Sequence, residues 1–266
     1  MYKPKVSIIM GVFNGRQRII DSIKSIQNQT FIDWEFIICD DGSTDGSYDL
    51  LLEISYNDSR IIPIKNIKNL GLTRTLNNCL SIAKGKYIAR MDDDDYSYPD
   101  RLKIQVDFLD KNPEFDFVSS AVDIYDGEKV VYQQMPRKIE PVKEDFLWGS
   151  CFVHPATVFR ANKLKEVNGY RYSKETRRAE DYDLFMRMYA SGMRGYNIDK
   201  PLLRYFVNPV AMKKRKYKYR IDEIIVRYKG FKKLDLFPKA LIYLFKPLLV
   251  ALIPKRLLLK LQRKIY

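Results

Sequence analysis

Four consecutive aspartates, Asp92 to Asp95, follow a short apolar run at residues 87–89. The apolar run predicts the end of a buried strand, and the pattern after Pro99 predicts a helix. The acids therefore occupy a turn at the carboxyl end of a strand, where open α/β sheets bind ligands. Adjacent carboxylates repel one another unless a cation lies among them, and their oxygens suit Mg²⁺ or Mn²⁺. A solvated acidic loop is the alternative interpretation.

The first half of the chain alternates apolar runs of strand length with stretches of helical spacing. Strands are predicted at residues 5–12, 34–39, 61–65 and 87–89, with a helix between each pair. This alternation predicts a parallel sheet with right-handed crossovers. From about residue 110 the pattern loosens, and further strands are predicted at 117–122 and 130–134.

The net charge of +14 belongs to one end of the chain. Residues 1–209 contain 30 Lys and Arg and 30 Asp and Glu, whereas residues 210–266 contain 17 Lys and Arg and three acids. This distribution indicates a neutral domain followed by a basic tail. The three cysteines, at positions 39, 79 and 151, lack metal-ligand or redox spacing and are typical of a reducing compartment.

Four stretches, taken together, resemble the family 2 glycosyltransferases with the GT-A fold. They are VSIIMGVFNG at 6–15, DDGSTD at 40–45, the acidic run with PDRL at 99–102, and EDYDL at 180–184. The resemblance implies a GT-A-like α/β domain, a Rossmann-type mainly parallel sheet flanked by helices, over residues 1–209. Its nucleotide-sugar half is expected at about 1–105 and its acceptor half at about 106–209, with a basic amphipathic helical tail at 210–266.

The resemblance also implies the reaction. An inverting enzyme of this family moves a sugar from a nucleotide-diphosphate sugar, here expected to be a UDP-sugar, to an acceptor hydroxyl in cell-surface polysaccharide or glycolipid synthesis. Asp92 and Asp94 match the Asp-x-Asp motif and are expected to hold Mn²⁺ or Mg²⁺, with Asp94 as the first choice; Asp93 adds an acid near the ribose or the ion. Asp181 matches the base that deprotonates the acceptor. Capping of a helix by Glu180 and Asp181 is the alternative.

The donor nucleotide is expected over the ends of the first two strands. Val12 and Phe13 would wall the nucleobase, Asn14 would lie at the turn, and Asp41 would accept a hydrogen bond from a uracil-like edge. Arg74 is expected either near the base and phosphates or as an ordinary exposed helix arginine.

Two further positions concern the acceptor and the metal. His154, in a His-Pro pair that the family often carries, is expected near the acceptor together with Glu180; a satisfied core histidine is the alternative. Many relatives have Arg-x-His where this chain has Phe206 and Asn208. The loss of a histidine nitrogen predicts weaker metal binding.

The basic tail predicts contact with an anionic membrane. Six apolar side chains share one side of a predicted helix (Leu241, Leu244, Phe245, Leu248, Leu249 and Leu252), and basic residues follow. Lys and Pro interruptions argue against a spanning helix, so the protein is expected to be cytoplasmic and peripheral on the inner face of the cell membrane, with a saccharide or lipid-linked acceptor. A helical hairpin packed on the catalytic domain is the alternative.

Two other functions are alternatives at the level of sequence. A nucleotidyltransferase on a related fold would release pyrophosphate instead of a nucleoside diphosphate. A catalytically silent membrane-binding protein could retain the fold, but it leaves Asp94 and Asp181 without a role. Nucleic acid is not an expected partner, because basic residues interleaved with tyrosines do not account for the acidic run.

Overall fold

The computed structural model describes residues 3–207 and 217–252 of the chain. Its strands form one sheet in the order β3-β2-β1-β4-β8-β6-β9-β5, and β7 pairs with β6 outside this path. The strands are β1 Val6–Val12, β2 Trp34–Asp40, β3 Ile61–Lys65, β4 Tyr87–Arg90, β5 Tyr96–Ser97, β6 Phe117–Tyr125, β7 Val130–Gln134, β8 Val158–Arg160 and β9 Gly195–Phe206.

Helices connect and cover these strands. The α-helices are α1 Ile19–Gln27, α2 Ser47–Asn57, α3 Leu72–Ile82, α4 Arg101–Lys111, α5 Ala161–Glu166, α6 Glu180–Ala190, α7 Tyr217–Lys233, α8 Ala240–Leu244 and α9 Lys246–Leu252. Three short 3₁₀ helices are η1 Lys143–Leu147, η2 His154–Ala156 and η3 Glu175–Arg178.

The predicted parallel sheet is confirmed for the first four βα units. β1 pairs in parallel with both β2 and β4, and β2 pairs in parallel with β3. The second half of the sheet is mixed: β6 and β9 are parallel, whereas β8 runs antiparallel to β4 and β6, and β5 antiparallel to β9. The pattern did not predict β9, because Asp199, Lys200 and Pro201 interrupt its apolar alternation.

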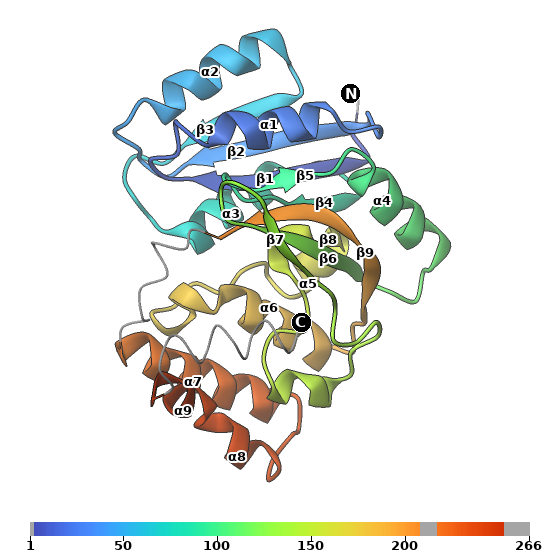
Figure 1. Cartoon of the computed structure of the whole chain (residues 1–266), viewed down its shortest axis with the longest axis vertical. Coiled ribbons are helices and arrows are strands. Elements are labelled where there is room, and N and C mark those ends of the chain that lie inside the picture. Colours follow the sequence, from blue (N-terminus) through green and yellow to red (C-terminus); the bar gives the residue numbers. More distant parts are fainter. Residues whose placement is uncertain (1–2, 208–216, 253–266) are drawn as a thin grey trace.

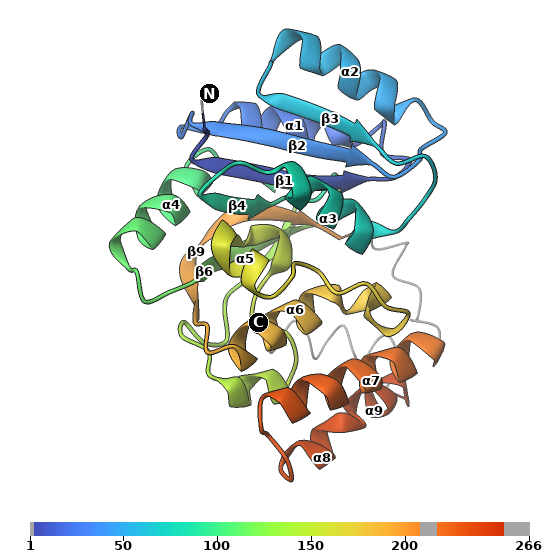
Figure 2. The same ribbon diagram turned by 180° about the vertical axis from the view of Figure 1, so that it is seen from behind.

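The sheet carries a core on each face. Successive side chains of a strand point to opposite faces, so Ile8 packs with α1 and α4, while Ile9 packs with α3 and the helices that follow β6. Figure 1 shows α1 in front of the sheet, and Figure 2, from behind, shows α3 and α5 on the opposite face.

The C-terminal helices pack against α6, on the lower side of the molecule in Figure 1. Val226 and Phe231 of α7 are fully buried and belong to the same core as α6. A Cβ atom at Gly230 would lie 2.3 Å from Met186 Sδ, so glycine permits the close approach of α7 to α6. This packing of α7 on α6 is the kind of contact that the packed-hairpin alternative expects, and membrane contact of the tail stays a prediction. The expected boundary at 209/210 lies outside the described residues.

None of the helices within residues 3–207 and 217–252 is both long enough and apolar enough to cross a bilayer. The basic residues of 253–266 lie outside the described part of the chain.

Candidate active site

The site lies where the parallel strands end. A cleft of about 600 Å³ opens between the end of β4, the segment after η1, the start of α6 and the tail helix α9. Four of the predicted site residues line it together: Asp92, His154, Glu180 and Asp181. The fold thus gathers, around one cavity, acids that are about 90 positions apart in the sequence.

Buried and half-buried arginines offset most of the charge of the acidic run. The guanidinium of Arg90, itself 1% exposed, forms an ion pair with Asp92 and donates to the carbonyl of Met91. Arg18, from the turn before α1, donates to Asp93 Oδ2 through Nε and Nη2 at 3.2 and 3.0 Å.

The fourth acid of the run has a structural task. Asp95 is 2% exposed, and its Oδ1 accepts from the backbone N–H of Phe206 at 2.9 Å, which ties the end of β9 to the acidic run. The charge of the fully buried Arg101 also interacts electrostatically with Asp95. Asn208, the expected replacement for a metal-ligating histidine, lies outside the described residues.

Asp94 is the acid of the run whose charge is not offset by an ion pair with a described residue. Among the described residues it has no ion-pair partner, and burial together with the charges of Asp92 and Asp93 raises its pKa to about 6. Such a carboxylate favours an added cation. No three His, Cys, Asp or Glu side chains in the described segments are grouped to hold a metal ion by themselves.

Two carboxylates open α6 at the other side of the cleft. Glu180 Oε2 is buried and has no hydrogen-bond partner within residues 3–207 and 217–252, and burial followed by the neighbouring charge of Asp181 raises the pKa of Glu180 to about 8. Glu180 is therefore protonated at neutral pH. Asp181 Oδ1 accepts from the N–H of the next residue, Tyr182, at 2.7 Å, and Asp181 also lines the cleft.

His154 lines the cleft as a buried, neutral ring. Its Nε2 is 2.7 Å from the hydroxyl of Tyr170, and burial, with the nearby charge of Arg90, lowers its pKa well below the ordinary value. The ring also lies edge-on to Phe185 in the core. This geometry suits a residue that positions the cleft wall and donates or accepts one hydrogen bond.

The predicted nucleotide residues lie along the ends of β1 and β2. Val12 is 1% exposed and packs in the core, so its side chain does not face the surface, whereas Phe13 is exposed. Asn14 has a positive φ of 50°; its N–H donates to Ser43 Oγ, and its Oδ1 accepts from Thr44 N–H at 3.0 Å. Asn14 therefore holds the two strand-end loops together.

Asp41 and Arg74 are both engaged by protein groups. Asp41 accepts from Asn66 Nδ2 and from the backbone N–H groups of Leu70 and Gly71, each at 2.8 Å. A carboxylate has about four acceptor positions, and these bonds from described residues leave one for a ligand. The Arg74 guanidinium lies 3.8 Å from the centroid of the Tyr172 ring, on the exposed face of α3.

The sequence analysis missed the arginines that compensate the acids. Arg90 carried a usable signal, because a cation in a strand otherwise read as buried needs an anionic partner. Arg18 carried none, since its approach to Asp93 depends on how the turn after β1 lies against the end of β4.

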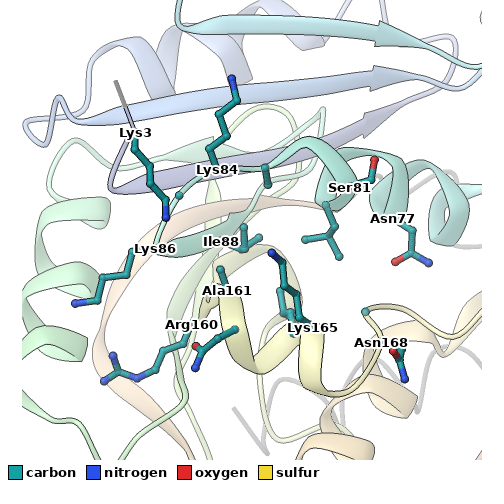
Figure 3. Close-up of a pocket in the computed structure, with 16 residues that line it drawn as sticks. Lys3, Asn77, Ser81, Lys84, Lys86, Ile88, Arg160, Ala161, Lys165 and Asn168 are labelled. Atoms are coloured by element: carbon teal, nitrogen blue, oxygen red, sulfur yellow. The ribbon is translucent and has the colours of Figure 1, made fainter. Parts of the chain in front are cut away.

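A larger hollow lies away from these acids. It measures about 830 Å³ and is lined by α3, the turn before β4 and α5, with several lysines around an apolar floor. Figure 3 shows Lys84, Lys86 and Lys165 around it. It contains none of the predicted site residues, so its size does not make it the active site.

Comparison with known proteins identifies the family. Residues 7–190 match the profile of glycosyl transferase family 2. The chain is 38% identical over 265 residues to EpsE of Bacillus subtilis, a glycosyltransferase by name, covering 98% of this chain and 94% of EpsE. It is 29% identical over 234 residues to WfaP of Escherichia coli, a UDP-Glc:alpha-D-GlcNAc-diphosphoundecaprenol beta-1,3-glucosyltransferase, covering 82% of this chain and 83% of WfaP.

Solved structures share the fold. TarS of S. aureus in complex with UDP-GlcNAc aligns with a TM-score of 0.71 at 19% identity, covering 89% of this chain and 72% of the other. A mannosyltransferase of Pyrobaculum calidifontis in complex with GDP-Man and Mn²⁺ aligns with a TM-score of 0.63 at 21% identity, covering 100% and 81% of the two chains. The expected GT-A-like architecture is confirmed.

Proposed function

The chain belongs to glycosyl transferase family 2, and from that premise we propose that this glycosyltransferase moves a sugar from a UDP-sugar to a hydroxyl of a lipid-linked saccharide, with inversion, in cell-surface polysaccharide synthesis. The observation that carries the proposal is the cleft shared by Asp92 and Asp181. The relative WfaP supports the donor and acceptor classes by its name, which specifies UDP-Glc and a diphosphoundecaprenol-linked sugar.

In this proposal Asp181 is the catalytic base. A single displacement with inversion needs one base on the face of the sugar opposite the leaving nucleotide. Asp181 would take the proton of the acceptor hydroxyl as the hydroxyl oxygen bonds to the anomeric carbon and the bond to the diphosphate breaks. Glu180, protonated at neutral pH, could donate a hydrogen bond to the acceptor, with His154 supporting the same wall.

The donor would lie along the strand ends, with Asp92 between its diphosphate and the cleft. Phe13 offers an exposed ring to the nucleobase, and Asp41 retains one acceptor position for its edge. Val12 and Asn14 would shape the base site from below, through core packing and loop contacts.

A divalent ion fits the charge pattern of the run. Asp92 and Asp93 are paired with arginines, whereas Asp94 is not paired in the described part of the chain. We propose that Asp94, with Asp92 beside it, holds Mn²⁺ or Mg²⁺ together with the donor diphosphate. When bound, such an ion offsets the negative charge that develops on the leaving group.

The tail supports association with the inner face of the cell membrane. Leu241 and Ile242 of α8, Phe245 between the two helices and Leu249 of α9 are each more than half exposed. Such apolar side chains beside a basic sequence suit the surface of an anionic bilayer. A cytoplasmic, peripheral location would place the cleft beside a lipid-linked acceptor.

Calorimetric titration of UDP, with and without Mn²⁺, tests the donor and metal proposals. Wild type should bind UDP more tightly with Mn²⁺, and Asp94→Ala should lose that gain, about tenfold, because it removes the unpaired carboxylate. Asp49→Ala, which removes an exposed carboxylate from α2, is the matched control and should bind as wild type. Equal affinity in all conditions would refute the metal role of Asp94, and no binding of UDP at all would refute the donor assignment.

A further inference from the structure

The tail contributes a side chain to the catalytic cleft. Lys246, the first residue of α9, lines the same cavity as Glu180 and Asp181. Its ammonium donates to the backbone carbonyl of Trp148, in the segment after η1, and lies 5.2 Å from the centroid of the Trp148 ring. An ammonium has three donors, and the hydrogen bonds that Lys246 makes to described residues leave two of them for a ligand in the cleft.

Other cations gather at the same cavity. Arg137 and Arg178 line it as well, and the Arg178 guanidinium lies 5.7 Å from the centroid of the Tyr219 ring of α7. Burial lowers the pKa of Lys246, and the charges of Arg227 and Arg137 lower it further, against the opposing charge of Glu223. This pKa direction indicates that positive charge accumulates around Lys246, which an anionic ligand would relieve.

Exposed apolar side chains flank this cationic group. Phe245 precedes Lys246 in the chain, and Leu249 lies one turn further along α9; both are more than half exposed. Trp148, also more than half exposed, packs edge-on against Tyr243 of α8 with ring centroids 5.0 Å apart. The rim of the cleft therefore places cations directly beside apolar surface.

We propose that α7 to α9 complete the acceptor side of the active site, and that Lys246, with Arg137 and Arg178, binds a phosphate of an acceptor whose hydrocarbon chain lies on the exposed apolar face of α8 and α9. This inference rests on the proposed glycosyltransferase function and adds the residues that would select a phosphorylated amphiphile. Lys246 is a binding residue here and takes no part in proton transfer.

Farnesyl diphosphate in calorimetric titration is a suitable probe, with saturating UDP and Mn²⁺ present to occupy the donor site. The probe should bind wild type, and Lys246→Gln should weaken binding at least tenfold, because it replaces the ammonium with a shorter, uncharged amide. Lys239→Gln is the matched control, because Lys239 is exposed, precedes α8 and removes the same charge from the tail without touching the cleft. It should bind within twofold of wild type.

Two ligands that each carry one half of the probe separate the sources of affinity. Farnesol should bind much more weakly if the phosphate is recognised, and inorganic diphosphate should bind weakly if the apolar face contributes. Equal losses of affinity in Lys246→Gln and Lys239→Gln would show that the overall charge of the tail causes the effect, and would overturn the proposal. Farnesol binding as tightly as farnesyl diphosphate would also overturn it.

The UDP titration on the same variants distinguishes the two levels of failure. Lys246→Gln should retain the UDP affinity of wild type. If UDP binds and the affinity for farnesyl diphosphate is the same in wild type and Lys246→Gln, this inference fails while the proposed function stands. If UDP binds none of the proteins, the proposed function fails, and the inference fails with it.

Discussion

Replacement of Glu180 by Gln should change how the stability of the protein depends on pH. In the folded protein the pKa of Glu180 rises from an ordinary value of 4.5 to about 8. The folded state therefore keeps a proton that the unfolded chain releases between these two values. Since the folded state binds more protons in that window, the free energy of unfolding falls as pH rises from about 4.5 to 8. Glu180→Gln cannot ionise and should lack this fall.

The full shift sets an upper limit for the effect. One pKa unit corresponds to about 1.4 kcal/mol, so the difference between 4.5 and 8 gives at most about 5 kcal/mol. The neighbouring charge of Asp181 supplies part of this shift, and a charge interaction at an open cleft is screened by solvent, so the measured effect should be smaller than this limit. We therefore expect Glu180→Gln to be more stable than wild type by about 1–2 kcal/mol at pH 8.5, and to match it within about 0.5 kcal/mol at pH 5.

Urea unfolding at several pH values measures this directly. Glu175→Gln is a matched control in the preceding 3₁₀ helix, where the hydrogen bond from Lys229 is the main cause that lowers the pKa of Glu175 to about 2. Its contribution has the opposite sign: it is present above about pH 4.5 and is lost as pH falls toward 2. Parallel stability curves for wild type and Glu180→Gln would refute the assignment of a protonated Glu180.

Three further changes test other parts of the site. Asp181→Asn should lower kcat about 10²- to 10⁴-fold with UDP affinity unchanged, measured as donor turnover and by calorimetry; full activity would refute the base assignment. Arg90→Met should lower the free energy of unfolding by about 3 kcal/mol, because it leaves the Asp92 charge without its partner; addition of Asp92→Asn should restore part of the loss, and a further loss would count against this explanation. Gly15→Ala would place a Cβ atom 2.4 Å from Asp93 Oδ2, so it should destabilise the protein by about 1–3 kcal/mol in thermal unfolding; an unchanged Tm would contradict that close contact.

The sequence predicted the parts of the fold that follow from local periodicity. The first four strands have high apolar content and regular spacing, and their parallel pairing follows from the helices between them. β9 was not predicted, because its stability depends on pairing with β6 along its length and not on its own alternation. Its last residue is fixed by Asp95, a contact between positions 111 apart.

The sequence predicted which residues form the candidate site better than it predicted their protonation and their ion pairs. Motif spacing indicated Asp92, Glu180 and Asp181, and the structure places them on one cleft. Spacing could not indicate that Glu180 keeps its proton or that Arg90 offsets Asp92, since both depend on burial in the folded chain. Lys246 was not predicted for a related reason: it lines the cleft only because the tail packs against α6.

The close crossing of α7 over α6 at Gly230 has an evolutionary consequence. Because the end of the Met186 side chain fills the space that a side chain at position 230 would need, substitutions at these two positions are expected to be coupled. The tail is then inherited with the helix that carries Asp181, and an exchange of tails between distant relatives would disturb the reactive end of that helix. Diversification of acceptor use in such a protein should proceed through paired changes across this crossing.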